Sequence, residues 1–423
     1  MVAYSEYVSD ARIRREAESL AKRGDSVDIV CLPHEHGTTR TTLNGVHIIP
    51  LNIRRYRGSS SLRYLCSYFT FFWRALLCVS WRHLRLHYDL VQVHTMPDFM
   101  VFTAILPRLT GAGVILDVHD LMPELYMSKF KLNREHRLIK AITTMERASV
   151  GFAHRAIAVH QPHLDALVAH GNSMDHFEIL LNTPDPSVFG SRISRCAGNS
   201  FKLVYHGTIS RRHGLEMALR ATALARRYIP TIKFSIIGDG DDLDRLMNLA
   251  VDLGLDGSVE FSRGSVPVHE LPDLLTDADL GIVPLKKDSF TQYMLPVKLM
   301  EYVALGIPAV VTRTGTIDHY FDDSMVEYIS GESADELAET IVRLYRAPKR
   351  REEMARCADE FTKFNNWSKQ KLVYYRLVDS LAPSEIHASN RRHLVSRRGF
   401  RIRERRSEIS GRAVQQSEDE SGR

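Results

Sequence analysis

Cysteine is scarce in this 423-residue chain, and no two cysteines form a C-x-x-C pair. The five are Cys31, Cys66, Cys78, Cys196 and Cys357. Their odd number, their scatter and the lack of a histidine at metal-ligand spacing argue against a disulfide framework or a zinc site. No signal-peptide pattern opens the sequence. We therefore predict a cytoplasmic protein with no metal and no other cofactor.

Acidic residues are absent from residues 36–88. Eight arginines lie there: Arg40, Arg54, Arg55, Arg57, Arg63, Arg74, Arg82 and Arg85. Within this segment residues 64–81 are apolar and aromatic, but the uncharged runs are shorter than the roughly 20 residues that span a bilayer. Arginines and rings on one helix suit the headgroup region of an anionic membrane. We predict peripheral membrane contact through residues 54–88; the alternative is a core helix packed on a sheet.

Apolar periodicity is missing from the end of the chain, where residues 384–423 carry ten arginines and six acidic residues. This composition predicts a disordered basic tail over residues 383–423. The interspersed acids argue against nucleic acid as a partner. A third glycine is missing after Gly238-Asp-Gly240, which argues against a dinucleotide site, and Asp239-Gly-Asp241 only imitates the aspartate pair of metal-dependent sugar transferases.

Alternating strand and helix patterns are present in the first half. A strand over residues 1–5, a helix over 11–23 and a strand over 27–32 make a β-α-β opening. Ligands bind at the carboxyl ends of such strands, so the 4–10 loop with Tyr4 and Ser5 is expected to face the cleft. Two further strands end in His94 and in His119-Asp120. Histidine titrates near neutrality and suits a reacting site, although such a residue is often structural.

A second series of strands and helices begins at residue 202. Its glycine-bounded loop, residues 207–214, lets backbone amides approach an anion, and Arg211 or Arg212 adds a guanidinium that matches phosphate. Both series together predict an α/β fold of two Rossmann-like parallel-sheet domains that face one cleft. The expected ranges are 1–183 for the first domain, 184–200 for a linker, 201–366 for the second domain, 367–382 for a crossover helix and 383–423 for the tail.

A helix after a loop is predicted in residues 292–311, with Pro296 at its start and Gly306 at its end. Its free N–H groups and positive dipole end favour phosphate. Glu301 lies about one and a half turns further in, where it can accept hydrogen bonds from a diol joined to that phosphate. The alternative is an ordinary helix between strands with a surface glutamate.

With these segments in order, the chain resembles the retaining glycosyltransferases of family 4, which have the GT-B fold. The resemblance covers about residues 1–382. It is carried by YVSDARIRREAESLAKRG, VQVHTMPDF, LDVHDLMPE, YHGTISRRHGLE, IIGDGDDL, VEFSRGSVP and LPVKLMEYVALGIPAVV. It implies transfer of a sugar from a nucleotide-sugar donor to a glycan or lipid-linked acceptor, with retention and without a metal.

The resemblance also implies roles for single residues. Glu301 is similar to the glutamate that holds the donor ribose, Arg212 to the cation that neutralises the diphosphate, and His119 to the histidine near the transferring sugar. The catalytic set is His119, Asp120 and Glu301. The donor-binding set is Gly207, Thr208, Arg211, Arg212, Gly238, Arg263, Gly264, Tyr293, Leu295, Pro296, Val297, Lys298 and Glu301. The acceptor side is Tyr4, Ser5 and His94.

Two positions depart from the family pattern. Tyr293 stands where many members carry a glutamate that touches the donor sugar, and His213 stands where a basic residue often precedes the second glycine of the 207–214 loop. Two other hypotheses stay open, of which the departure at Tyr293 favours the first and the motifs match the second less well than a transferase. One is a nucleotide-binding partner subunit that has lost turnover, and the other is a nucleotide-sugar epimerase on the same scaffold.

Overall fold

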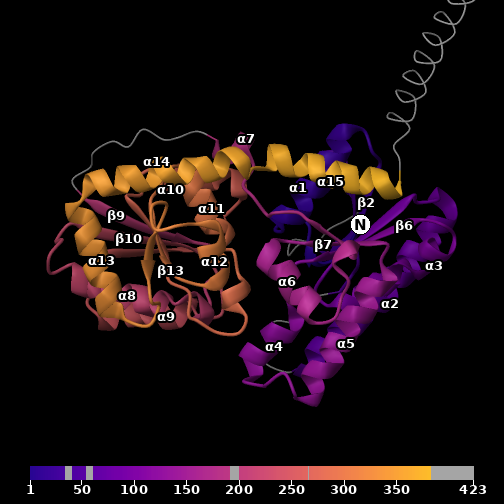
Figure 1. The fold of residues 1–423 in the computed structure, drawn as a ribbon, viewed down its shortest axis with the longest axis horizontal. Helices are drawn as coiled ribbons and strands as arrows, with labels where there is room; N and C mark the ends of the chain where they lie inside the picture. Colours follow the sequence, from indigo (N-terminus) through magenta and orange to yellow (C-terminus); the bar gives the residue numbers. More distant parts are fainter. Residues whose placement is uncertain (34–40, 54–60, 191–199, 265, 383–423) are drawn as a thin grey trace, which may run out of the picture.

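The computed structural model of the chain describes residues 1–33, 41–53, 61–190, 200–264 and 266–382. Figure 1 shows two sheet-centred domains side by side, with the last helices running along both. The predicted basic tail, Cys196, Arg40, most of the predicted linker and the start of the predicted membrane segment, including Arg54, Arg55 and Arg57, lie outside the described residues.

The first domain is built on an eight-stranded sheet in the order β3-β4-β2-β1-β5-β6-β7-β8. Its strands are β1 (Val2–Glu6), β2 (Val27–Leu32), β3 (Thr41–Leu43), β4 (Val46–Pro50), β5 (Leu90–His94), β6 (Gly113–Val118), β7 (Arg155–Ala158) and β8 (Phe177–Ile179). All neighbours are parallel except β3 and β4. The strand order reverses between β1 and β5, which is where sheets of this type bind ligands.

Helices cover both faces of this sheet. They are α1 (Ala11–Arg23), α2 (Ser61–Leu86), α3 (Ile105–Leu109), α4 (Met122–Phe130), α5 (Arg137–Phe152) and α6 (Gln161–Ala169), with 3-10 turns η1 (Asp98–Ala104) and η2 (Met174–His176). The predicted start and end of α1 are confirmed: Asp10 accepts bonds from the Arg12 and Ile13 amides, and Gly24 ends the helix with φ +103°. The segment that follows β5 begins as the 3-10 turn η1 and continues into α3.

The second domain has a six-stranded parallel sheet in the order β11-β10-β9-β12-β13-β14. Its strands are β9 (Phe201–His206), β10 (Ile232–Gly238), β11 (Val259–Arg263), β12 (Leu280–Val283), β13 (Ala309–Thr312) and β14 (Glu327–Ile329). Its helices are α8 (Leu215–Ala225), α9 (Leu243–Asp252), α10 (Leu271–Leu275), α11 (Val297–Ala304), α12 (Gly315–Tyr320) and α13 (Ala334–Arg346), with turns η3 (Arg211–His213), η4 (Val268–Glu270) and η5 (Thr291–Tyr293). The order reverses between β9 and β12.

The last helix crosses back to the first domain, as the fold prediction requires. After α7 (Pro186–Phe189) and α14 (Pro348–Phe364), α15 (Trp367–Leu381) lies against α1 (Figure 1). The Tyr374 hydroxyl donates to Gln92 Oε1 at 2.6 Å, and Asp379 pairs with Arg23 at 2.9 Å. Trp367 and Tyr374 belong to the same buried apolar cluster as the inner residues of α1.

Helix α2 has two different apolar faces. Phe71, Ala75 and Val79 are buried in the first-domain core, as the core-helix alternative requires. The outward face nevertheless carries six exposed large apolar residues: Leu65, Phe69, Trp73, Leu77, Trp81 and Leu84. No helix in the described ranges is both long and apolar enough to cross a membrane.

Candidate active site

The carboxyl ends of β5 and β6 bring together a group of three polar side chains. Asp117 Oδ2 accepts hydrogen bonds from His94 Nδ1 and His119 Nε2, each at 2.9 Å. The two ring nitrogens are 3.3 Å apart, and the rings meet edge to face. All three residues are buried. Asp117 therefore fixes the orientation of both imidazoles before any ligand arrives.

The charge on this group is set by its own members. Burial favours the neutral carboxyl, but the two imidazoles hold the pKa of Asp117 far below its usual range. Burial lowers the pKa of His94, although Asp117 opposes that shift. An ionised Asp117 held between two histidines is the arrangement expected when one imidazole must present its other nitrogen to a reacting group.

The same three atoms offer the donor set of a divalent metal site. His94, Asp117 and His119 each present one ligand atom, and these atoms lie within 4.8 Å of one another. Two imidazoles and a carboxylate suit zinc. The mutual hydrogen bonds also satisfy these atoms without an ion. Burial lowers the pKa of neighbouring Arg12, but Asp10, Asp120 and Asp117 together raise it above its usual value. A guanidinium that already neutralises these carboxylates disfavours a second cation.

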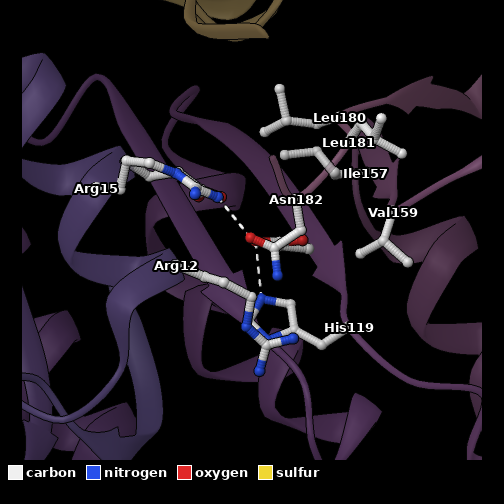
Figure 2. A pocket seen from close by; sticks show the side chains of 10 residues that line it. Arg12, Arg15, His119, Ile157, Val159, Leu180, Leu181 and Asn182 are labelled. Carbon is white, nitrogen blue, oxygen red and sulfur yellow. Dashed lines mark hydrogen bonds and ion pairs between the residues drawn. The ribbon is translucent and has the colours of Figure 1, made fainter. Parts of the chain in front are cut away.

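A small cavity of about 10 Å³ adjoins Asp117 and His119 (Figure 2), which is room for about one water molecule. Arg12, Arg15, Glu16 and Asn182 complete its polar lining. Arg15 donates to Asn182 Oδ1 at 2.5 Å and to the Thr183 carbonyl, which holds the end of the first domain against α1.

The predicted acceptor-side residues take different positions. His94 belongs to the polar group above, whereas Tyr4 is 8% exposed and packs its ring against Tyr68 and Phe71 of α2. Its hydroxyl bonds to Ser67 Oγ at 2.5 Å. Tyr4 therefore packs against α2, and its acceptor-side role stays a prediction. Ser5 is partly exposed, and Asp120 lies beside Arg12.

Glu301 stands at the carboxyl end of the second sheet in a fixed position. Its Oε2 lies 2.5 Å from Nε2 of His206, the last residue of β9, and Glu301 is 8% exposed. The backbone amide of His206 donates to the Tyr302 hydroxyl at 3.1 Å. The surface-glutamate alternative is therefore wrong: one carboxylate oxygen is held by an imidazole, and the other has no hydrogen bond among the described residues.

Lys298, in the first turn of α11, lies over the end of β9. Its ammonium donates to the Tyr205 hydroxyl at 3.2 Å and sits 4.4 Å from the centre of that ring. Gly207 has φ +108°, and a side chain there would meet the Lys298 amine and its neighbouring carbon at about 3.5 Å. Burial lowers the pKa of Lys298 to about 8, and Glu301 opposes the shift.

The cations of the 207–214 loop lie further out. Arg211 keeps 79% of its side chain exposed and approaches Asp242 at 3.7 Å, while Arg212 stacks on Phe290 at 5.1 Å. His213 is buried and its pKa is lowered to about 2, by burial first and then by Lys298 and Arg212. His213 is thus neutral and cannot replace the cation that other family members carry there.

Glycines shape the same edge through backbone contact. A side chain on Gly238 would collide with the Gly207 carbonyl at 2.0 Å, and one on Gly240 would meet the Ile209 carbonyl at 1.9 Å. Gly238 therefore serves close packing of two strand ends. Gly264 has φ +96°, which favours glycine. Ser265 lies outside the described residues, and Arg263 is described by its strand position alone.

The two domains touch through polar contacts beside this site. Ser128 Oγ donates to Asp288 at 2.7 Å, and Ser289 Oγ donates to the Glu124 carbonyl at 3.2 Å. His160 Nε2 lies 2.9 Å from the Tyr293 carbonyl. Tyr293 also packs on the first-domain core, so the residue at the expected sugar-contact position joins the domains.

The sequence did not predict four residues of the site, which are Asp117, Arg12, His206 and Arg15. Asp117 had a signal, because it lies two residues before His119 and strand periodicity puts both on one face. Arg12 had another, since it opens a helix that follows the predicted cleft loop. His206 pairs with a residue 95 positions away, and no local pattern reveals such a contact.

Two Rossmann-like domains and a helix returning to the first define the GT-B class. Sucrose-phosphate synthase from Thermosynechococcus elongatus has this fold at a TM-score of 0.71 and 16% identity, over 90% of this chain and 98% of that one. Anabaena HepE in complex with UDP matches at a TM-score of 0.63 and 14% identity, over 90% of this chain and 99% of that one. Identities this low show the fold alone.

Matches to two protein-family models identify the family of this chain. The profile of "Glycosyl transferase 4-like domain" matches residues 9–183, and that of "Glycosyl transferases group 1" matches residues 191–361. The chain therefore belongs to the group 1, family 4-like glycosyltransferases. A GDP-mannose-dependent alpha-(1-6)-phosphatidylinositol monomannoside mannosyltransferase of Mycolicibacterium smegmatis is 29% identical over 37% of this chain and 41% of its own length. The chain spans about half the length of the curated relatives that it matches.

Proposed function

We propose that this protein is a retaining glycosyltransferase that moves a sugar from a nucleotide-diphosphate sugar to a glycan or lipid-linked acceptor in cell-surface polysaccharide or glycolipid synthesis. The observation that carries the proposal is the placement of Glu301, which is fixed by His206 beside Lys298 and the first turn of α11. Glu301 can bind a ribose diol, and Lys298 can bind a diphosphate. The two residues lie within one turn of α11, as the neighbouring ribose and diphosphate of a nucleotide-sugar donor require.

The chemistry follows from where charge develops. The leaving group is a nucleoside diphosphate, and its negative charge grows as the glycosidic bond breaks. Lys298, Arg212 and the free amides of α11 supply fixed positive charge at that edge, which lowers the barrier. In the proposed retaining reaction, the acceptor hydroxyl attacks from the face that the diphosphate leaves. The departing phosphate takes the hydroxyl proton, so no strong protein base is required.

The first domain contributes the acceptor side of the proposed reaction. Asp117 holds His119 through Nε2, which leaves His119 Nδ1 to meet a hydroxyl of the sugar or acceptor. Asp120 and Arg12 lie beside it and compensate each other's charge. Ser5 and His94 complete the proposed acceptor side.

We also propose that the protein works at the cytoplasmic face of a membrane and docks there through α2. Trp73, Leu77, Trp81 and Leu84 are 47–68% exposed on the outward face. Arg63, Arg74 and Arg85 are exposed and eleven residues apart, about three turns, so they line one flank of that face. Rings, leucines and arginines in this arrangement match an anionic headgroup layer. The matching mannosyltransferase, whose name gives it a phosphatidylinositol-based acceptor, supports a lipid acceptor.

Donor turnover tests the proposed reaction. Purified protein is incubated with UDP-, GDP- and ADP-sugars, and release of nucleoside diphosphate is measured with and without lipid extract. We expect one donor to be consumed and the rate to rise with acceptor. Binding without turnover across the panel would favour a non-catalytic partner subunit, and conversion of the donor to an epimer without acceptor would favour an epimerase.

Vesicle binding tests the proposed membrane surface. The wild type should bind vesicles that contain phosphatidylglycerol better than vesicles of phosphatidylcholine alone. Leu77→Glu should weaken binding at least tenfold, since burying one leucine contributes about 1.5–3 kcal/mol. Leu274→Glu is the matched control, because Leu274 is a half-exposed leucine of α10 in the other domain. Equal binding by both variants would refute docking through α2.

A further inference from the structure

The ammonium of Lys298 is a partly buried cation whose hydrogen bond goes to a hydroxyl and not to a carboxylate. Its partners among the described residues are the Tyr205 hydroxyl and ring, and it takes part in no ion pair there. The Tyr205 hydroxyl donates its hydrogen bond to the Thr208 carbonyl at 2.5 Å. It therefore acts as an acceptor toward Lys298. Two of the three ammonium N–H groups are thus left for another partner.

Other cations nearby are less suitable. Arg211 is mostly exposed and approaches Asp242, and Arg212 is held over the Phe290 ring. His213 is neutral, because its pKa is lowered to about 2. Among these groups Lys298 alone lies over the end of β9, in the first turn of α11, with a charge that no carboxylate compensates within hydrogen-bond distance.

The geometry points to Lys298, not Arg211 or Arg212, as the principal cation that binds the diphosphate of the nucleotide-sugar donor. This inference rests on the proposed function and assigns the diphosphate to one residue of that site. Lys298 stands in the first turn of α11, whose preceding residue Pro296 provides no side-chain cap. Backbone N–H groups and the ammonium therefore meet the same anion. Glu301, three residues on, is placed for the ribose.

Donor binding should then be coupled to protonation. The titratable groups that interact with the Lys298 amine are Tyr205 of β9, His213 of η3 and Glu301 of α11. Burial raises the pKa of Tyr205 and Tyr302, so both stay neutral at moderately alkaline pH. Lys298 itself has a pKa of about 8 without ligand. A bound diphosphate favours its charged form, so binding above pH 8 takes up a proton and weakens as pH rises.

Calorimetry on the full chain tests this assignment with UDP, GDP and ADP and with the matching nucleosides. Lys298→Met should weaken the preferred nucleoside diphosphate about 10- to 100-fold, the range of a lost charge-assisted contact, and leave the nucleoside unaffected. Arg212→Met should weaken it less. Lys349→Met, which changes an exposed lysine at the start of α14, is the matched control and should change nothing.

A pH series from 7 to 9.5 provides the second measurement. Wild-type affinity should fall above pH 8, and Lys298→Arg should remove that fall because arginine stays charged. Equal diphosphate affinity in Lys298→Met and wild type, a larger loss in Arg212→Met, or an alkaline fall that persists in Lys298→Arg would overturn the assignment. Wild-type protein that binds none of the three diphosphates would instead refute the proposed function.

Discussion

The polar groups at the carboxyl edges of the two sheets differ in the partners that hold them. In the first domain the polar groups hold one another by hydrogen bonds: Asp117 accepts from two histidines, and Arg15 donates to Asn182 and to the Thr183 carbonyl. In the second domain Lys298 and Arg212 contact rings and a hydroxyl instead of carboxylates.

The difference separates two ways of preparing a site. A compensated group is rigid before ligand arrives, which suits orientation of an acceptor and a transferring sugar. An uncompensated cation raises the free energy of the empty site and is relieved when an anion binds. The second domain is thus organised for a strongly charged ligand, and the first for hydroxyl groups.

Removing Glu301 from the second-domain site should cause the largest loss of activity. Glu301→Ala deletes the proposed ribose contact and leaves the buried His206 imidazole without its partner. We expect a loss of about 2–4 kcal/mol in transition-state stabilisation, read from kcat/KM. Glu332→Ala, at an exposed position before α13, is the control and should keep wild-type kinetics. Undiminished activity in Glu301→Ala would remove the basis of the proposed donor site.

A pH titration of stability tests the compensated state of the first domain. Burial opposes charge on His170, but bonds to Glu124 at 3.0 Å and Glu146 at 2.9 Å raise its pKa to about 9. The charged form therefore stabilises the fold fully below the unfolded pKa of about 6.5, and this stabilisation is lost as pH rises through 9. The change is on the order of 3 kcal/mol.

Denaturant unfolding from pH 6 to 10 checks this prediction. Wild-type stability should fall toward alkaline pH, and His170→Gln should be less stable at pH 6 with a flatter profile. His269→Gln is the control, because His269 is an exposed histidine of the turn η4 in the second domain. The same slope in His170→Gln and wild type would mean that another group carries the dependence.

Substituting Asp117 should weaken the hydrogen bonds that orient His94 and His119 while the side-chain shape at this position is kept. Asp117→Asn keeps the shape but replaces a carboxylate that accepts two N–H bonds by an amide that accepts less strongly. We expect kcat to fall about 10- to 100-fold, the pH profile of kcat to shift and the donor KM to stay unchanged. Asp252→Asn changes an exposed aspartate at the end of α9 and serves as the control. A loss of stability with an unshifted pH profile would limit Asp117 to packing.

The smallest effect is expected where the two domains meet. Ser128→Ala removes the 2.7 Å bond to Asp288, which contributes about 1 kcal/mol. If that bond holds the domains together around bound donor, donor KM should rise a few-fold while thermal stability of the free protein hardly changes. Ser324→Ala, an exposed serine in the second domain, should alter neither value. An unchanged donor KM in Ser128→Ala would exclude this contact from donor binding.

Local patterns predicted the architecture well and the site in part. The strands over 27–32 and 113–118 and the end of α1 at Gly24 follow from apolar runs and caps that act over a few residues. The composition of the 207–214 loop left Arg211 and Arg212 open and the family resemblance favoured Arg212, but only the fold shows that Arg211 is exposed and that Arg212 lies over a ring. Tyr4 was expected at the acceptor, but long-range packing against α2 decides its place.

The return of α15 to the first domain has a consequence for how the chain is made. Trp367 and Tyr374 are buried among residues of α1 and β2, so the apolar cluster of the first domain includes side chains made more than 330 residues after its first helix. During synthesis the second domain, whose strands lie within residues 201–329, has all its core segments first. The first domain must keep an apolar surface open until almost the whole described chain has emerged.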